Sequence, residues 1–140
     1  MDKFKILIVE DDENILKIID TVLDETAFEK KAAMDGKEAL RTYEEWNPDV
    51  IVLDIMLPVM TGFSFLKEVR QHINDTKTPI IMTTGVSKKE TVMECMSLGV
   101  QGYIVKPFKP ETILQRICEC CHETYPDRAA QAGPKLAPAP

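Results

Sequence analysis

Short apolar segments alternate five times with amphipathic segments along the chain, and this alternation limits the possible fold more than any other feature. The apolar segments are continuous, which is typical of strands buried on both faces of a parallel sheet. They cover residues 4–9, 28–34 (the weakest), 50–53, 79–83 and 102–105. Helical spacing of apolar residues follows each one, over 15–23, 37–46, 63–72, 87–98 and 111–122. We therefore expect an α/β fold with a five-stranded parallel sheet covered by helices on both faces.

Composition indicates a single acidic domain. Of the 140 residues, 44% are hydrophobic and 29% are charged, which is enough apolar material for one core. The net charge of -6 repels phosphate backbones, so we expect no nucleic-acid binding by this chain. No apolar stretch approaches the roughly 20 residues that span a bilayer, and the N-terminus lacks a signal-peptide pattern. We expect a cytoplasmic protein that does not bind membranes.

The C-terminal residues 125–140 differ from the rest of the chain. They are rich in Pro and Ala and carry almost no large apolar side chain, so burial cannot offset the entropy lost on ordering them. We predict a domain over 1–124 and a disordered tail or linker over 125–140.

Three of the four cysteines lie close together beside a histidine. Cys118, Cys120 and Cys121 precede His122, but the spacing is not that of a C-x-x-C metal site and a second ligand cluster is lacking. In a reducing cytosol these cysteines and Cys95 are expected to be free thiols. We predict small buried side chains on a helix rather than metal ligands.

Polar side chains follow four of the five predicted strands. The carboxyl ends of parallel strands meet at one edge of the sheet, where such folds bind their ligands. The residues found there are Glu10 and Asp11 after the first strand, Asp54 after the third, Thr84 after the fourth and Lys106 after the fifth. One acid in such a place often caps a helix, as we expect for Asp12. The whole set at successive strand ends predicts a single site.

The residue types at this edge favour phosphoryl chemistry. Three clustered carboxylates repel each other, and without a cation at least one would have a raised pKa. Mg²⁺ relieves this repulsion, because it prefers oxygen ligands and needs only one or two direct carboxylates. Together with Lys106 it would neutralise the oxygens of a phosphoryl group. A carboxylate can be the nucleophile itself, which forms an aspartyl phosphate.

Over roughly residues 4–123 the chain resembles the receiver-domain family of two-component signalling. The resemblance rests on the motifs ILIVEDDEN (6–14), VLDIMLPVMTG (52–62), PIIMTTG (79–85) and GYIVKPF (102–108). It implies a flavodoxin-like (βα)₅ fold, doubly wound, with strand order 2-1-3-4-5.

The resemblance also implies how the acids divide their roles. Asp54 matches the phosphoacceptor, and Asp11 matches the acid that ligates Mg²⁺ directly. Glu10 matches an acid that acts through a metal-bound water, and the backbone carbonyl of Met56 matches the third protein ligand.

Three further residues match the switching machinery of the family. Lys106 resembles the lysine that pairs with the phosphoryl group, and a cis peptide bond is expected before Pro107. Thr84 resembles the hydroxyl that moves toward a phosphoryl oxygen. Tyr103 resembles the aromatic switch that turns inward when the threonine moves.

Some positions depart from the commonest family pattern. Thr61 stands where Asp or Asn is frequent, and Gly85, where Ala is usual, loosens the backbone beside Thr84. Met56 and Val86 match positions that flank the route of the hydrolytic water. Because neither side chain can hydrogen-bond that water, we hypothesise slow self-dephosphorylation.

The resemblance implies a signalling switch rather than an enzyme acting on external substrates. A histidine kinase or histidine phosphotransfer protein would donate the phosphoryl group. The surface of the fourth helix, fifth strand and fifth helix would then control a downstream protein, an attached output domain or a second copy in a homodimer. Exposed residues expected on that surface are Lys88, Lys89, Gln101 and Lys109.

Three other functions fit the fold class. One is a phosphate-independent receiver-like binding module, against which the intact site residues argue. A phosphatase of another aspartyl-phosphate family would need a second Asp where Met56 stands. A flavin-binding electron carrier would need a Ser/Thr/Gly-rich loop after the first strand, where this chain has the acidic EDDEN.

Overall fold

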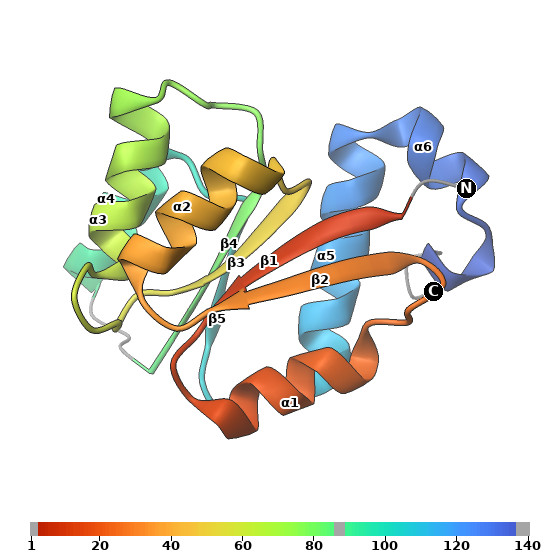
Figure 1. The fold of residues 1–140 in the computed structure, drawn as a ribbon, viewed down its shortest axis with the longest axis horizontal. Helices are drawn as coiled ribbons and strands as arrows, with labels where there is room; N and C mark the ends of the chain where they lie inside the picture. The colour runs from red at the N-terminus through yellow and green to blue at the C-terminus, as the bar shows by residue number, and fades with distance from the viewer. Residues whose placement is uncertain (1–2, 86–88, 137–140) are drawn as a thin grey trace.

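The structure is a computed structural model that describes residues 3–85 and 89–136, without the side chain of Lys135. Its strands are β1 (Phe4–Val9), β2 (Phe28–Ala33), β3 (Val50–Asp54), β4 (Ile80–Thr84) and β5 (Gly102–Val105). They form one parallel sheet in the order β2-β1-β3-β4-β5, which confirms the predicted fold (Figure 1). The chain moves from β1 outward to β2 and then crosses back to β3, so the order reverses between β1 and β3. In such sheets a ligand site is expected beyond that point.

Helices cover both faces of the sheet. The helices are α1 (Glu13–Val22), α2 (Gly36–Trp46), α3 (Gly62–Lys67) with its π-helical continuation η1 (Glu68–His72), α4 (Lys89–Leu98) and α5 (Pro110–Thr124). Figure 1 shows α1 and α5 on one face and α2, α3 and α4 on the other. Among the described residues, no helix has both the length and the apolar character needed to cross a membrane.

Successive side chains of the strands pack alternately into two separate hydrophobic cores, one on each face of the sheet. Ile6 and Ile8 of β1 pack with α1 and α5, whereas Leu7 and Val9 pack with α2, α3 and α4. Because successive side chains of a strand point to opposite faces, a strand covered on both sides must be apolar at every position. This requirement explains the continuous apolar runs in the sequence.

Polar side chains fix the beginnings of the helices near the site. Asp12 caps α1, as expected, and its Oδ1 accepts a hydrogen bond from the Asn14 amide at 2.9 Å. Asp35 caps α2 and accepts from the Glu38 amide at 2.8 Å. These caps satisfy amide groups that have no partner within the helix, and they place the residues before each helix at the edge of the sheet.

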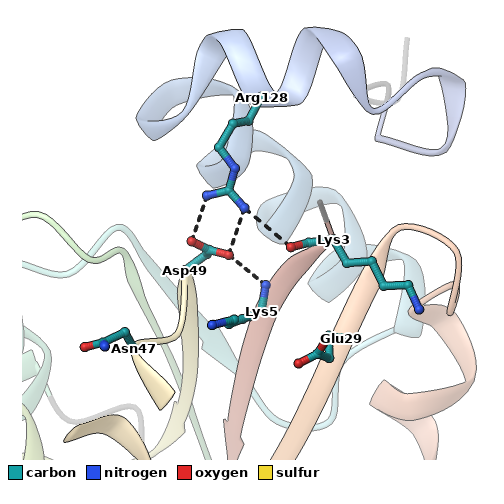
Figure 2. Close-up of a pocket in the computed structure, with 6 residues that line it drawn as sticks. All are labelled: Lys3, Lys5, Glu29, Asn47, Asp49 and Arg128. Carbon is teal, nitrogen blue, oxygen red and sulfur yellow. Dashed lines mark hydrogen bonds and ion pairs between the residues drawn. The ribbon is translucent and has the colours of Figure 1, made fainter. Parts of the chain in front are cut away.

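The C-terminal segment differs from the disordered tail expected there. Residues Pro126–Gln131 form helix α6 and Pro134–Leu136 a single 3-10 turn, and both Ala129 and Leu136 are buried in the core beside α5. Figure 2 shows why the segment docks: the Arg128 guanidinium donates to both carboxylate oxygens of Asp49, at 2.9 and 3.2 Å. The Tyr125 hydroxyl donates to the Asp49 carbonyl at 2.9 Å. Polar contacts and a small buried alanine thus replace the apolar stripe that ordinary helices need.

The four cysteines are free and buried, as predicted. Burial raises the pKa of Cys120 to about 11, so its thiol is not ionised near neutral pH. None of the cysteines belongs to the cluster of possible metal ligands found among the described residues.

Candidate functional site

Two buried carboxylates and one exposed carboxylate meet at the carboxyl edge of the sheet. Glu10 follows β1 and Asp54 ends β3, and they are only 2% and 3% exposed. Asp11 is exposed beside them. Oxygens of the three carboxylates lie within 4.8 Å of one another. The structure thus brings together the three acids that the sequence placed at this edge.

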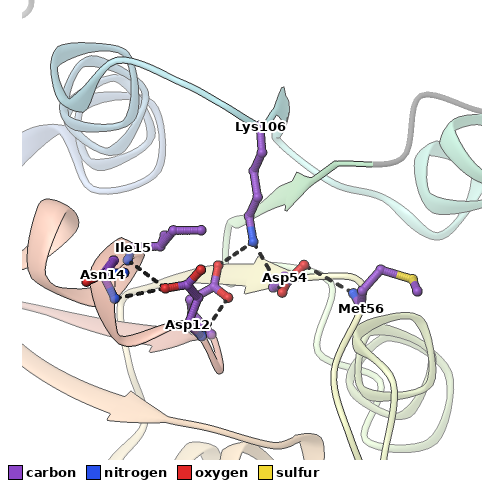
Figure 3. A network of polar contacts seen from close by, with 7 residues as sticks. Asp12, Asn14, Ile15, Asp54, Met56 and Lys106 are labelled. Carbon is purple, nitrogen blue, oxygen red and sulfur yellow. Dashed lines mark hydrogen bonds and ion pairs between the residues drawn. The ribbon is translucent and has the colours of Figure 1, made fainter.

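Lys106 lies across the two buried carboxylates. Its Nζ is 2.5 Å from Oε1 of Glu10 and 3.3 Å from Oδ2 of Asp54 (Figure 3). Burial lowers the pKa of Lys106, but the hydrogen bond to Glu10 and the charge of Asp54 outweigh it and raise that pKa. The lysine is therefore a fixed positive charge at the site.

The environment of Glu10 raises the pKa of its carboxyl group. Burial raises the pKa of its carboxyl group, and the neighbouring charge of Asp54 adds to this effect, so that the pKa is about 7. The hydrogen bond from Lys106 acts in the opposite direction without cancelling it. A divalent cation at this place would favour the ionised form.

Backbone amides orient the two buried carboxylates. The amide of Asp12 donates to Oε2 of Glu10 at 3.2 Å, and the amide of Met56 donates to Oδ1 of Asp54 at 3.1 Å (Figure 3). Each acid is thus held by the residue two positions after it, in the loop that leaves its strand. These amides were not apparent from the sequence, because they depend on the path of the two loops.

The remaining predicted residues lie at or near the same edge. Thr84 is buried at the end of β4, and its carbonyl accepts from the Lys106 amide at 2.7 Å. Tyr103 of β5 is half-buried and packs against the core under α4. The peptide bond before Pro107 is cis, as expected. The moving roles of Thr84 and Tyr103 remain predictions.

The donor set fits Mg²⁺. This ion takes oxygen ligands in octahedral geometry and keeps several waters, so it suits a cluster with one carboxylate open to solvent. Asp11, Asp54 and Glu10 supply only oxygen donors, and a thiol or imidazole that would favour zinc is absent from the cluster.

Comparison with known proteins agrees with this fold. A doubly wound sheet with an acidic cluster at its switch point defines an α/β ligand-binding domain. Residues 6–118 match the family described as "Response regulator receiver domain", and the chain belongs to this family.

Two named relatives are longer proteins than this chain. The chain is 38% identical over 104 residues to the regulatory protein AtoC of Escherichia coli, covering 74% of this chain and 22% of AtoC. It is 35% identical over 113 residues to the alkaline phosphatase synthesis transcriptional regulatory protein PhoP of Bacillus subtilis, covering 81% and 46%. The chain thus spans less than half the length of these two proteins.

Solved structures of similar size share most of the fold. The chemotaxis response regulator CheY4 of Vibrio cholerae is 37% identical, with a TM-score of 0.77 over 85% of this chain and 99% of that chain. A CheY-like receiver domain protein from Methanospirillum hungatei is 29% identical, with a TM-score of 0.82 over 90% and 99%. CheY of Borrelia burgdorferi, solved with CheX, BeF₃ and Mg²⁺, is 31% identical, with a TM-score of 0.74 over 83% and 87%.

Proposed function

We propose that this receiver domain is a phosphorylation-dependent switch of a cytoplasmic two-component system, with Asp54 as the phosphoacceptor. A histidine kinase or histidine phosphotransfer protein would supply the phosphoryl group. The observation that carries the proposal is the position of Asp54, which lies in the acidic cluster with Glu10 and Asp11 and has its Oδ2 3.3 Å from the ammonium nitrogen of Lys106.

The geometry supports in-line transfer to the Asp54 carboxylate. An Asp54 oxygen would attack phosphorus while the bond from phosphorus to the donor imidazole nitrogen breaks, and the imidazole leaves with that electron pair. Lys106 would neutralise charge on the transferred oxygens, because its Nζ already lies 3.3 Å from Asp54. Bound Mg²⁺ would supply further positive charge at these oxygens, held by Asp11, Asp54 and the Met56 carbonyl, with Glu10 acting through water.

An apolar hollow beside the site supports docking of a phosphodonor. It is lined by Ile15 and Ile18 of α1 and by Lys106, Pro107 and Phe108. Ile18 is partly exposed although it lies on an amphipathic helix, so the apolar stripe of α1 extends onto the surface. A helix of the donor protein could cover this hollow and bring its phosphohistidine toward Asp54.

The proposed output surface consists of α4, β5 and α5. Phosphorylation would draw Thr84 and then Tyr103 toward the site, which shifts the population between two arrangements of this surface. A downstream protein, an output domain or a second copy would bind one arrangement. Lys89 and Lys109 are exposed there, whereas Lys88 lies outside the described residues. Gln101 does not fit the expectation of a free surface residue, because its Oε1 accepts from the Ile80 amide at 2.8 Å.

The test is chemical phosphorylation followed by intact mass measurement. The protein is incubated with acetyl phosphate and Mg²⁺, and one phosphoryl group is expected to be gained. Asp54→Asn and EDTA should each abolish the gain, whereas Asp12→Asn should retain it, because the Asp12 side chain caps α1 and the substitution keeps the backbone amide that donates to Glu10. Failure of the unchanged chain to be labelled, under conditions that label a known receiver, would favour the phosphate-independent binding module.

A further inference from the structure

Gly36 begins helix α2 and lies against the loop that joins β3 to α3. A Cβ atom on Gly36 would be 2.3 Å from the carbonyl oxygen of Met60 and 2.6 Å from its Cβ. Both distances are far below van der Waals contact, and one of the two atoms belongs to the backbone. A side chain at position 36 would therefore displace the loop itself, because a change of rotamer cannot move a carbonyl oxygen.

The end of the same loop, at Gly62, packs closely against the backbone of the residues that begin it. A Cβ on Gly62 would lie 2.1 Å from the carbonyl oxygen of Asp54, and the Gly62 amide donates to the Ile55 carbonyl at 3.1 Å. Within the loop the Met60 amide donates to the Pro58 carbonyl at 2.7 Å. Because of these close contacts, the loop cannot accommodate a shift of Met60 locally. The shift would extend along the loop toward Met56.

Met56 connects this loop to the acidic cluster. Its amide donates to Oδ1 of Asp54 at 3.1 Å, and its carbonyl is the proposed third protein ligand of Mg²⁺. A displacement of Met56 would thus disturb both the orientation of the Asp54 carboxylate and a direct ligand.

We propose that Gly36 is a positioning residue for the magnesium site, acting through the backbone of Met60. The inference rests on the proposed function, because it takes the acidic cluster to be that site. It assigns a metal-binding consequence to the first residue of helix α2, which lies outside the loop that carries Met56. Interactions that orient metal ligands commonly change metal affinity about 10- to 100-fold when they are lost.

The experiment compares Mg²⁺ binding by the full chain and by Gly36→Ala, using isothermal titration calorimetry. The dissociation constant is expected to rise about tenfold in Gly36→Ala. Gly85→Ala is the matched control near the site, because a Cβ there meets no described atom within 4 Å, and its dissociation constant should be unchanged. Circular dichroism in EDTA checks that α2 is retained, since Ala favours a helix more than Gly does.

The outcomes separate this inference from the proposed function. If the unchanged chain binds no Mg²⁺, the proposed function fails. If the unchanged chain and folded Gly36→Ala bind Mg²⁺ equally, the positioning role is wrong while the proposed function stands. If Gly36→Ala does not fold, Met60→Gly loosens the same contact without introducing a clash, because it removes the Met60 Cβ and Cγ that lie over Gly36 and frees the backbone at position 60. It should also weaken Mg²⁺ binding, and unchanged affinity would overturn the inference.

Discussion

Lys106 and Glu10 form an ion pair at the carboxyl edge of the sheet, with 2.5 Å between Nζ and Oε1. The same ammonium group lies 3.3 Å from Asp54, so a single cation pairs with both buried carboxylates. Lys106 therefore contributes part of the charge compensation that a bound metal ion would provide.

Replacement of Lys106 should strengthen metal binding and slow phosphoryl transfer. In Lys106→Met the acids lose their fixed cation, so Mg²⁺ should bind several-fold more tightly. Labelling by acetyl phosphate should nevertheless become much slower, because the charge on the transferred oxygens is less well neutralised. Calorimetry and timed mass spectra measure the two effects. Equal labelling rates in both proteins would contradict the role given to Lys106.

The aspartyl phosphate should be long-lived. The Met56 side chain is 64% exposed beside Asp54 and offers no hydrogen bond to an attacking water, and Val86 lies outside the described residues. Met56→Asn should accelerate loss of the phosphoryl group several-fold, because an amide can orient that water. The decay of phosphorylated protein after removal of acetyl phosphate gives the rate. A fast decay in the unchanged chain that Met56→Asn leaves unaltered would refute the hypothesis.

Stability at low pH should depend on Asp75. Burial raises the pKa of this carboxyl group, but hydrogen bonds from Thr78 and Tyr43 outweigh burial and lower the pKa to about 2 from 3.8. Because the folded-state pKa is the lower one, the stabilisation is present above about pH 4 and is lost as the pH falls toward 2. Asp75→Asn should cost about 1–3 kcal/mol at pH 7. Urea unfolding at pH 7, 4 and 2.5 should show this difference shrinking, and a constant difference would exclude the ionised carboxylate as its cause.

Val59 should be a site where substitution stabilises the protein. Its φ of 66° lies in the left-handed region, which β-branched residues adopt only with strain, and its side chain is 79% exposed. Val59→Asn should raise the free energy of unfolding by about 1 kcal/mol, since Asn tolerates this conformation. Val59→Ala, which retains a Cβ, should gain less. Equal effects of the two substitutions in urea unfolding would show that strain is not the cause.

The C-terminal segment should protect the thiols of α5. Ala129 and Leu136 pack in the same core as Cys118, Cys120 and Cys121. A chain ending at Thr124 should therefore unfold at a lower temperature and react faster with a thiol reagent in its folded state. Arg128→Ala, which loses the contact to Asp49, should show a smaller effect in the same direction. Unchanged thiol reactivity in the shortened chain would support a domain that is complete at residue 124.

The sequence placed the strands and the acidic site well because both depend on local pattern. Strand β1 begins and ends where its apolar run does, and Glu10 follows it directly. The topology of a parallel sheet then brings the strand ends together without further information.

Contacts between distant segments could not be predicted in this way. Arg70 lies within a predicted helix, where a basic side chain usually points to solvent, yet it is only 6% exposed. Its guanidinium donates to the carbonyls of Gly99, Asp75 and Thr78 at 2.9, 2.7 and 2.8 Å. Helix α6 likewise depends on Asp49, which is 79 residues from Arg128. Neither partner leaves a local signal in the sequence.

The two edge strands of the sheet differ in a way that bears on assembly. Strand β2 exposes Glu29 and Lys31 along its edge, and such charges oppose pairing with another strand. Strand β5 has only four residues, all of them partly exposed or exposed, and it includes Tyr103 and Val105. Head-to-tail growth would require β2 of one copy to pair with β5 of the next. Pairing between copies is therefore expected at β5 alone, a two-fold arrangement that closes at two copies and cannot extend into a fibre.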